Sequence, residues 1–123
     1  MADPIERLME TSLMHVFNER DTHRRLAAIE HIYAPDVEWT DDEGVTVGQD
    51  QLNAKTHALQ NGPLAGLSFA KAGPVHQTRG LGYLAWNVVA PGSDQPIASG
   101  FDVALVTDGR IRQLFTVLTE TFG

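Results

Sequence analysis

The chain has no cysteine, few basic residues and no long hydrophobic run. Without cysteine, neither a disulfide framework nor a thiolate metal site can form. No segment approaches the roughly 20 apolar residues needed to span a bilayer. The first residues also lack the basic and apolar segments of a secretory signal peptide. We therefore expect a cytoplasmic protein with no membrane partner.

Positive charge is scarce, because 9 Lys and Arg residues stand against 16 Asp and Glu residues and the formal net charge is −7. The basic residues are scattered, and only Arg24 and Arg25 are adjacent. Nucleic acids and anionic membrane surfaces bind clustered Lys and Arg. We therefore expect no nucleic-acid partner.

Several motifs for catalysis and cofactor binding are also missing. The sequence contains no Gly-x-Ser-x-Gly elbow, no Walker motif and no Gly-x-Gly-x-x-Gly. His15, His23 and His31 do not have the spacing of a metal site. We expect neither a metal nor a cofactor.

The pattern of apolar residues predicts one α+β domain over residues 1–123. One helix opens at Asp3-Pro4, a second begins at Asp21 or Thr22 and is ended by Pro35, and a third covers about residues 48–60. A short strand over 36–41 runs into an acidic turn at 41–44. Further strands are expected over 67–71, 75–79, 81–90, 97–107 and 110–118. Helices followed by antiparallel strands favour a curved sheet with helices on one face.

Residues 100–118 predict a hairpin with a type I′ turn at Asp108-Gly109. A two-residue turn fixes the register, which places Asp102 opposite Phe115. The face shared with Asp102 is predicted to carry Gly100, Ala104, Val106, Ile111, Gln113, Phe115 and Val117. An Asp in this apolar field must be paired, protonated or in a wet cavity, so Asp102 is the first candidate functional residue.

The opposite face of the hairpin is predicted to carry Phe101, Val103, Leu105, Arg112, Leu114 and Leu118. This face is too apolar to remain in water. We therefore expect a homodimer through the outer face of the sheet.

Two carboxylates around an apolar pocket can divide the acid and base roles. Asp102 is the candidate acid or hydrogen-bond donor, with a structurally held buried Asp as the alternative. Asp41 is the candidate base, with a surface turn residue as the alternative. The candidate ligand-binding residues are Tyr33, Trp39, Phe69, His76, Trp86 and Phe115. For the aromatic residues the alternative is ordinary core packing, and for His76 it is a surface position.

Three motifs stand in an order that resembles the nuclear transport factor 2-like superfamily, and within it the SnoaL-like group. They are the segment from Tyr33 to Trp39, Gly44 and Gly48 before a helix, and Gly100-Phe101-Asp102-Val103 leading to Asp108-Gly109-Arg110-Ile111. The resemblance covers nearly the whole chain. It implies a cone-shaped α+β barrel of the cystatin-like type, with a curved antiparallel or mixed sheet wrapped over three N-terminal helices, an internal cavity and frequent dimerisation through the sheet.

The resemblance includes the ketosteroid isomerases. Asp41 has the spacing of their catalytic base after Tyr33-Ala34-Pro35-Asp36, and Asp102-Val103 matches their proton-donating Asp. Their tyrosine on the first helix has no counterpart among Leu13, Met14, His15 and Phe17. The Asp-Arg-Asp set of the related epoxide hydrolases cannot be assembled, although Arg79 or Arg112 could be proposed for its arginine.

Two functions stay open. The first is a cofactor-free acid–base enzyme of the isomerase, cyclase or hydratase type, which acts on a small apolar or carbonyl-bearing metabolite. The second is a non-catalytic module that holds a ligand in the same cavity or binds a partner through the sheet.

Overall fold

The computed structural model describes residues 4–122, so the predicted cap at Asp3 lies outside the described residues. Helix α1 (Pro4–Thr11) continues as a π-helical segment, η1 (Ser12–Phe17). Helix α2 (Thr22–Ile32) begins after Asp21, whose side chain accepts a hydrogen bond from the backbone N–H of Arg24. Helix α3 (Gln49–Gln60) follows Gly48. The three predicted helices are therefore confirmed.

Helix α2 ends before the position predicted from Pro35. Tyr33 already has extended backbone angles and pairs with Ile111, so strand β1 (Tyr33–Asp41) begins there and contains the proline. Pairing between β1 and its neighbour is irregular between Tyr33 and Glu38. Proline has no N–H to donate, and such an irregularity accommodates it within the sheet.

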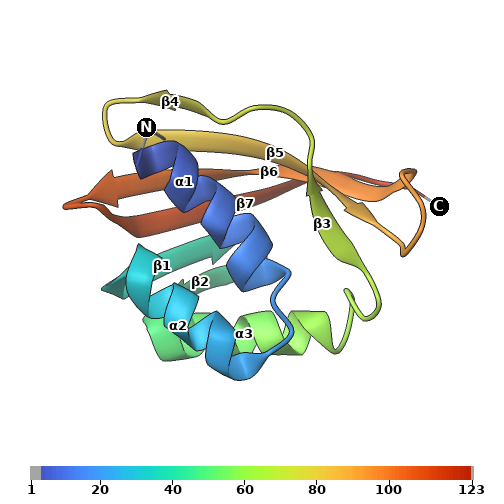
Figure 1. Cartoon of the computed structure of the whole chain (residues 1–123), viewed down its shortest axis with the longest axis horizontal. Coiled ribbons are helices and arrows are strands. Elements are labelled where there is room, and N and C mark those ends of the chain that lie inside the picture. Colours follow the sequence, from blue (N-terminus) through green and yellow to red (C-terminus); the bar gives the residue numbers. More distant parts are fainter. Residues whose placement is uncertain (1–3, 123) are drawn as a thin grey trace.

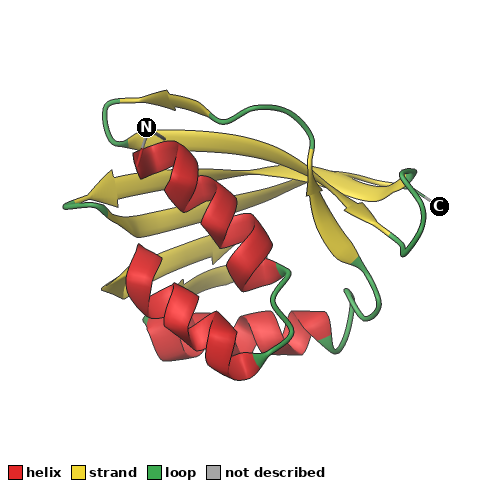
Figure 2. Cartoon of the chain, in the orientation of Figure 1, coloured by secondary structure: helices red, strands yellow, loops and turns green. Residues whose placement is uncertain are grey.

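The remaining strands are β2 (Gly44–Val47), β3 (Ser68–Lys71), β4 (His76–Thr78), β5 (Leu81–Val89), β6 (Pro96–Thr107) and β7 (Arg110–Thr121). The order across the sheet is β2-β1-β7-β6-β5-β3, and β4 pairs with β5. Among the strands of residues 4–122, only β1 and β7 pair in parallel, so the sheet is mixed. The helices lie on one side of the curved sheet (Figures 1 and 2). The predicted α+β class is confirmed.

No helix of residues 4–122 combines the length and the apolar character that crossing a membrane requires.

The turn between β6 and β7 has positive φ values at Asp108 and Gly109, as a type I′ turn requires. The first two predicted pairs, Thr107 with Arg110 and Val106 with Ile111, are present. The register then shifts, because Leu105 pairs with Gln113 and Asp102 pairs with Thr116. A β-bulge of one extra residue on β7 produces this shift. The predicted pairing of Asp102 with Phe115 is wrong.

Beyond Arg112, the bulge reverses which side chains of β7 lie on the inner face of the sheet and which lie on the outer face. Leu114 is fully buried in the core, and Thr116 lies beside Asp102 on the inner face. Phe115 and Val117 instead pair with Val103 and Phe101 on the opposite side. The predicted faces of Gln113, Leu114, Phe115, Val117 and Leu118 are therefore wrong, whereas the predicted faces of the β6 residues agree with the structure.

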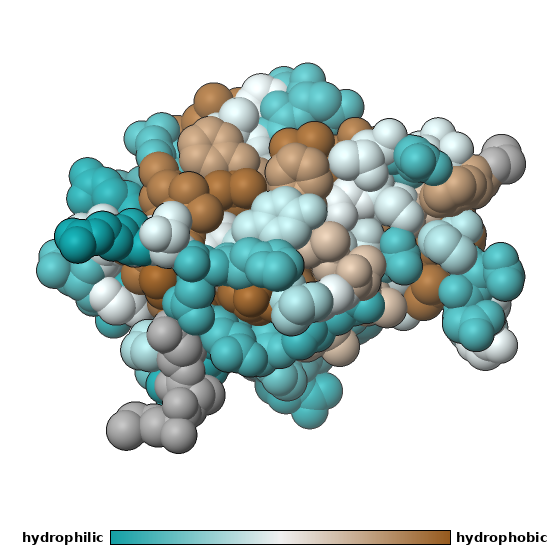
Figure 3. All heavy atoms as spheres, turned by 90° about the horizontal axis from the view of Figure 1, so that it is seen from above, coloured by the Kyte–Doolittle hydropathy of each residue, from teal (hydrophilic) through white to brown (hydrophobic). Residues whose placement is uncertain are grey.

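The sheet has an outer apolar face, which the helices do not cover. It carries Tyr83, Phe101, Val103, Phe115 and Val117. The rings of Tyr83 and Phe101 lie 5.1 Å apart. Figure 3 looks down on this side of the molecule and shows hydrophobic side chains gathered across its middle.

Candidate functional site

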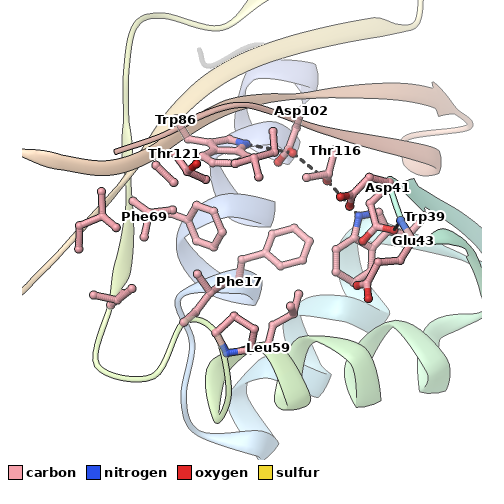
Figure 4. A pocket seen from close by; sticks show the side chains of 18 of the residues that line it. Phe17, Trp39, Asp41, Glu43, Leu59, Phe69, Trp86, Asp102, Thr116 and Thr121 are labelled. Carbon is pink, nitrogen blue, oxygen red and sulfur yellow. Dashed lines mark hydrogen bonds between the residues drawn. The ribbon is translucent and has the colours of Figure 1, made fainter. Parts of the chain in front are cut away.

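A pocket of about 480 Å³ lies between the inner face of the sheet, η1 and the segment that connects α3 to β3 (Figure 4). Its size falls within the range of small-molecule sites. Most of its wall is apolar. The lining residues are Phe17, Trp39, Asp41, Asp42, Glu43, Leu59, Pro63, Leu64, Leu67, Phe69, Trp86, Val88, Ile97, Ala98, Asp102, Thr116, Leu118, Thr121 and Phe122.

Asp102 lies on the inner face of β6 and is only 3% exposed. Its Oδ1 accepts a hydrogen bond from Nε1 of Trp86 at 3.1 Å and another from Oγ1 of Thr116 at 2.9 Å. Gly100 makes this arrangement possible, since a Cβ atom at that position would lie 2.6 Å from the indole of Trp86. The indole can therefore lie flat against the strand and present its N–H to the carboxylate.

Thr116 connects Asp102 to a second indole, because Nε1 of Trp39 donates to Oγ1 of Thr116 at 2.9 Å. A hydroxyl has one proton, and Thr116 uses it on Oδ1 of Asp102. Oδ1 therefore accepts two hydrogen bonds, and a proton on the neutral carboxyl is carried by Oδ2.

Oδ2 of Asp102 accepts no hydrogen bond from residues 4–122. Every fully buried side-chain nitrogen or oxygen of these residues has a hydrogen-bond partner. Because Oδ2 has none, it is not fully buried, and it is the oxygen of the carboxyl that reaches the pocket. Burial raises the pKa of Asp102 to about 6, while the hydrogen bonds from Trp86 and Thr116 oppose this rise. Near neutral pH the carboxyl can therefore both release and accept a proton at Oδ2.

Asp41 lies at one end of the pocket, but both of its carboxylate oxygens already have partners within the protein. Its Oδ2 lies 2.5 Å from Nζ of Lys55, and its Oδ1 accepts a hydrogen bond from the backbone N–H of Glu43 at 3.0 Å. Nζ of Lys55 is also 3.7 Å from the carboxylate of Glu43 and 5.0 Å from the ring centroid of Trp39. The acidic turn thus already binds an ammonium group of the chain itself.

Among the predicted ligand-binding residues, Trp39, Phe69 and Trp86 line the pocket together. The Phe69 and Trp86 rings meet edge to face at 5.0 Å. Phe17, which sequence reasoning placed only on a helix face, lies 5.1 Å from the ring of Trp39 and completes an aromatic wall. Trp86 thus faces inward, as a ligand-binding residue must.

The other three predicted ligand-binding residues do not line this pocket. The hydroxyl of Tyr33 is buried in a hydrogen bond with Ser12, and this burial raises its pKa. His76 lies on β4, where its ring is 6.0 Å from Tyr83 of the outer apolar face. Phe115 lies on that face because of the bulge. The predicted inward face of Phe115 is therefore wrong, whereas Tyr33 is buried in the core and His76 lies on β4, and neither reaches the pocket.

Thr116 is the site residue that sequence reasoning missed. The sequence does contain a signal for it. Ile111 and Leu114 are apolar and three residues apart, with polar Arg112 and Gln113 between them. A strand of strict period two cannot bury both apolar residues, so the spacing indicates a bulge and turns Thr116 inward.

One wall of the pocket is held by two side chains of the connection between η1 and α2. The Asn18 amide donates to the backbone oxygen of Phe69 at 2.9 Å and accepts from its N–H at 2.7 Å. The guanidinium of Arg20 donates to the backbone oxygens of Gln60, Leu64 and Leu67 at 2.6, 3.1 and 2.6 Å. The three hydrogen bonds of Arg20 position the segment that closes the pocket opposite the sheet, and the two of Asn18 hold strand β3 beside it.

Within residues 4–122, no group of three or more His, Asp or Glu side chains could hold a metal ion.

No protein-family model and no curated protein matches the sequence. Solved structures do match it. A candidate isomerase of the SnoaL-like family from Agrobacterium tumefaciens is 24% identical, with a TM-score of 0.86 over 95% of this chain and 98% of that chain. A candidate SnoaL-like polyketide cyclase from Jannaschia sp. CCS1 is 13% identical, with a TM-score of 0.70 over 96% and 90%.

An NTF2-like protein of unknown function from Burkholderia pseudomallei is 16% identical, with a TM-score of 0.73 over 96% of this chain and 92% of that chain. The three structures share one architecture with this chain over nearly their whole lengths. The chain has the fold of the nuclear transport factor 2-like superfamily, as found in SnoaL-like proteins.

Proposed function

We propose that this protein is a cofactor-free enzyme that moves a proton on a small apolar or carbonyl-bearing molecule held in the pocket. The observation that carries the proposal is Oδ2 of Asp102. It is the one oxygen of a buried carboxyl that reaches an apolar pocket, while Oδ1 is fixed by two donors. A perturbed carboxyl in such a cavity is a typical acid–base group.

The geometry supports one simple proton cycle. Neutral Asp102 donates its proton from Oδ2 to an oxygen of the substrate, and the carboxylate that remains keeps its hydrogen bonds from Trp86 and Thr116. The same oxygen then takes a proton from a carbon or oxygen of the intermediate, which restores the neutral acid. Isomerisation, cyclisation and hydration all need transfers of this kind.

The fold relatives support this reaction class, since one is described as a candidate isomerase and another as a candidate cyclase. Their low identity carries over no substrate. We do not assign the base role to Asp41, because both of its carboxylate oxygens are already engaged by Lys55 and by the backbone of Glu43.

A second candidate function is a binding module without catalysis. The observation that favours it is the apolar character of η1 at the pocket. Leu13 is fully buried, and Phe17 presents only a hydrocarbon ring. No tyrosine from this helix faces Asp102 across the cavity, so a second group to share proton transfer is missing there.

We also propose that the outer apolar face binds a second copy of the chain. Tyr83, Phe101, Val103, Phe115 and Val117 form a continuous surface that costs free energy in water. Light scattering is expected to give a dimer at micromolar concentration, and Val103→Lys is expected to give a monomer. A monomeric parent protein contradicts this proposal.

Hydrogen–deuterium exchange into a panel of enolisable and α,β-unsaturated ketones tests the enzyme. We expect NMR spectra in D2O to show catalysed exchange with the parent protein and a loss of at least a hundredfold with Asp102→Asn, in line with the usual contribution of a general acid or base. Asp94→Asn, in the exposed loop between β5 and β6, is the matched control. Equal rates for parent and Asp102→Asn overturn the assignment, whereas binding without exchange favours the module.

A further inference from the structure

The pocket is unbalanced in charge. Four carboxylates, from Asp41, Asp42, Glu43 and Asp102, belong to its lining. No Lys, Arg or His of the described chain belongs to it, although Lys55 pairs with Asp41 from outside the lining. An organic anion would meet no cationic side chain in the lining, because Lys55 lies outside it and is already paired with Asp41. Like charges in a desolvated site repel strongly.

The hydrogen bonding of Asp102 is a second observation, since the residue is only 3% exposed and one of its carboxylate oxygens has no partner among residues 4–122. Its Oδ1 is held by Trp86 and Thr116, while Oδ2 accepts no hydrogen bond from residues 4–122. An ionised carboxylate in an apolar wall is stabilised by an opposite charge within a few ångströms. A ligand can supply that charge.

The aromatic wall suits a positive group as well. Ring faces attract cations, most strongly those of tryptophan. One such contact is present at the end of the pocket, where Nζ of Lys55 lies 5.0 Å from the ring centroid of Trp39 and 2.5 Å from Oδ2 of Asp41. Trp86, Phe17 and Phe69 extend the same kind of surface inward to Asp102 (Figure 4).

We infer that the natural ligand has an apolar body and a basic nitrogen that meets Oδ2 of Asp102, and that the pocket excludes organic acids. The inference rests on the proposed function, because it concerns the substrate of the same pocket. Where the nitrogen is an imine, the nitrogen counterpart of a carbonyl, the proton on Oδ2 passes to it and leaves an iminium–carboxylate pair. The O–H bond of Asp102 breaks and an N–H bond of the ligand forms, and no other bond changes, so the step balances.

The inference predicts a specific dependence on pH. The titratable groups near Asp102 are Asp41, Asp42 and Glu43 of the lining, and Tyr33 behind it. A bound cation favours the ionised form of Asp102 and lowers its pKa by about one unit or more. The affinity for a permanently protonated amine should therefore rise about tenfold as the pH rises through the range in which Asp102 ionises.

Three compounds that share one ring system test this. We would measure the binding of 1-naphthylmethylamine, 1-naphthylmethanol and 1-naphthoate by calorimetry at about pH 5 and about pH 8, on either side of the pKa of Asp102. The amine stays protonated throughout. We expect the amine to bind most tightly at the higher pH, with about a tenfold gain from the lower pH, and the naphthoate to bind least. Asp102→Asn should abolish the gain, and Asp94→Asn should keep it.

The outcomes separate this inference from the proposed function. If all three compounds bind equally, or the naphthoate binds best, the charge preference is wrong while the pocket stands as a small-molecule site. If the amine gains affinity equally in the parent and in Asp102→Asn, the exposed acidic turn rather than Asp102 attracts it, and the inference is overturned. If none of the three binds, both the inference and the proposed pocket are wrong.

Discussion

Replacement of Asp102 by asparagine should stabilise the protein, and only at high pH. Burial raises the pKa of this carboxyl from its ordinary value of 3.8 to about 6. Between these two values the folded state binds more protons than the unfolded state, so stability falls as the pH rises. Each pKa unit corresponds to about 1.36 kcal/mol, so the ionised carboxylate costs about 3 kcal/mol above the folded pKa.

Asparagine keeps an oxygen for the donors Trp86 and Thr116 but cannot ionise. At about pH 8 we expect Asp102→Asn to raise the free energy of unfolding by about 2–3 kcal/mol and the Tm by about 10 °C. At about pH 4, where Asp102 is protonated in the folded state, the two proteins should differ by less than about 1 kcal/mol.

Urea denaturation followed by tryptophan fluorescence at both pH values measures this difference. Asp94→Asn, in an exposed loop, is the control for the general effect of removing one negative charge, and it should change stability by less than about 0.5 kcal/mol at either pH. An Asp102→Asn protein that is less stable than the parent at both pH values, or more stable by the same amount at both, refutes the reasoning. The carboxyl would then not be a desolvated acid in the folded state.

Three further substitutions test the architecture of the pocket. Thr116→Val removes a donor to Asp102, so carbon-13 NMR titration should give a carboxyl pKa above the parent value of about 6. Gly100→Ala places a methyl group 2.6 Å from the Trp86 ring and closer still to the backbone oxygen of Val117, and urea denaturation should show a loss of about 1–3 kcal/mol. Arg20→Ala removes three hydrogen bonds to backbone oxygens, so amide hydrogen exchange in the segment after α3 should become at least about tenfold faster.

Each of these has its own control or contradicting result. Thr116→Ser keeps the hydroxyl and should keep the carboxyl pKa, so an equal rise in both variants would point to packing rather than hydrogen bonding. A Gly100→Ala protein as stable as the parent contradicts the tight contact in the sheet. Arg24→Ala removes only an exposed ion pair with Glu19, and if it accelerates exchange as much as Arg20→Ala does, the wall is not held by Arg20.

Much of the fold could be predicted because local signals agree with the final structure. Asp21 caps α2, Gly48 precedes α3, and Asp108-Gly109 forms the turn between β6 and β7. Each of these depends on a few neighbouring residues and their backbone preferences. The inward position of Asp102 also followed, because alternation along β6 is regular.

The candidate site was harder to predict, since it depends on contacts between distant strands. One bulge in β7 exchanged Phe115 for Thr116 beside Asp102, and this changed the partner of the carboxyl from a ring to a hydroxyl. The ion pair of Asp41 with Lys55 joins the end of β1 to α3, and no sequence period predicts such a pair. Predicting which side chains meet at the site therefore required the register of the strands, and a single bulge changes that register.

The shape of the pocket depends on hydrogen bonds from Asn18 and Arg20, whereas its chemistry depends on other side chains. Asp102 and its donors belong to the sheet, whereas the opposite wall is positioned by Arg20, which does not line the cavity. The volume available to a ligand can therefore change through substitutions at the surface, while Asp102 and its partners stay as they are. Related chains with this arrangement can thus accept different ligands around the same cluster of Asp102, Trp86 and Thr116.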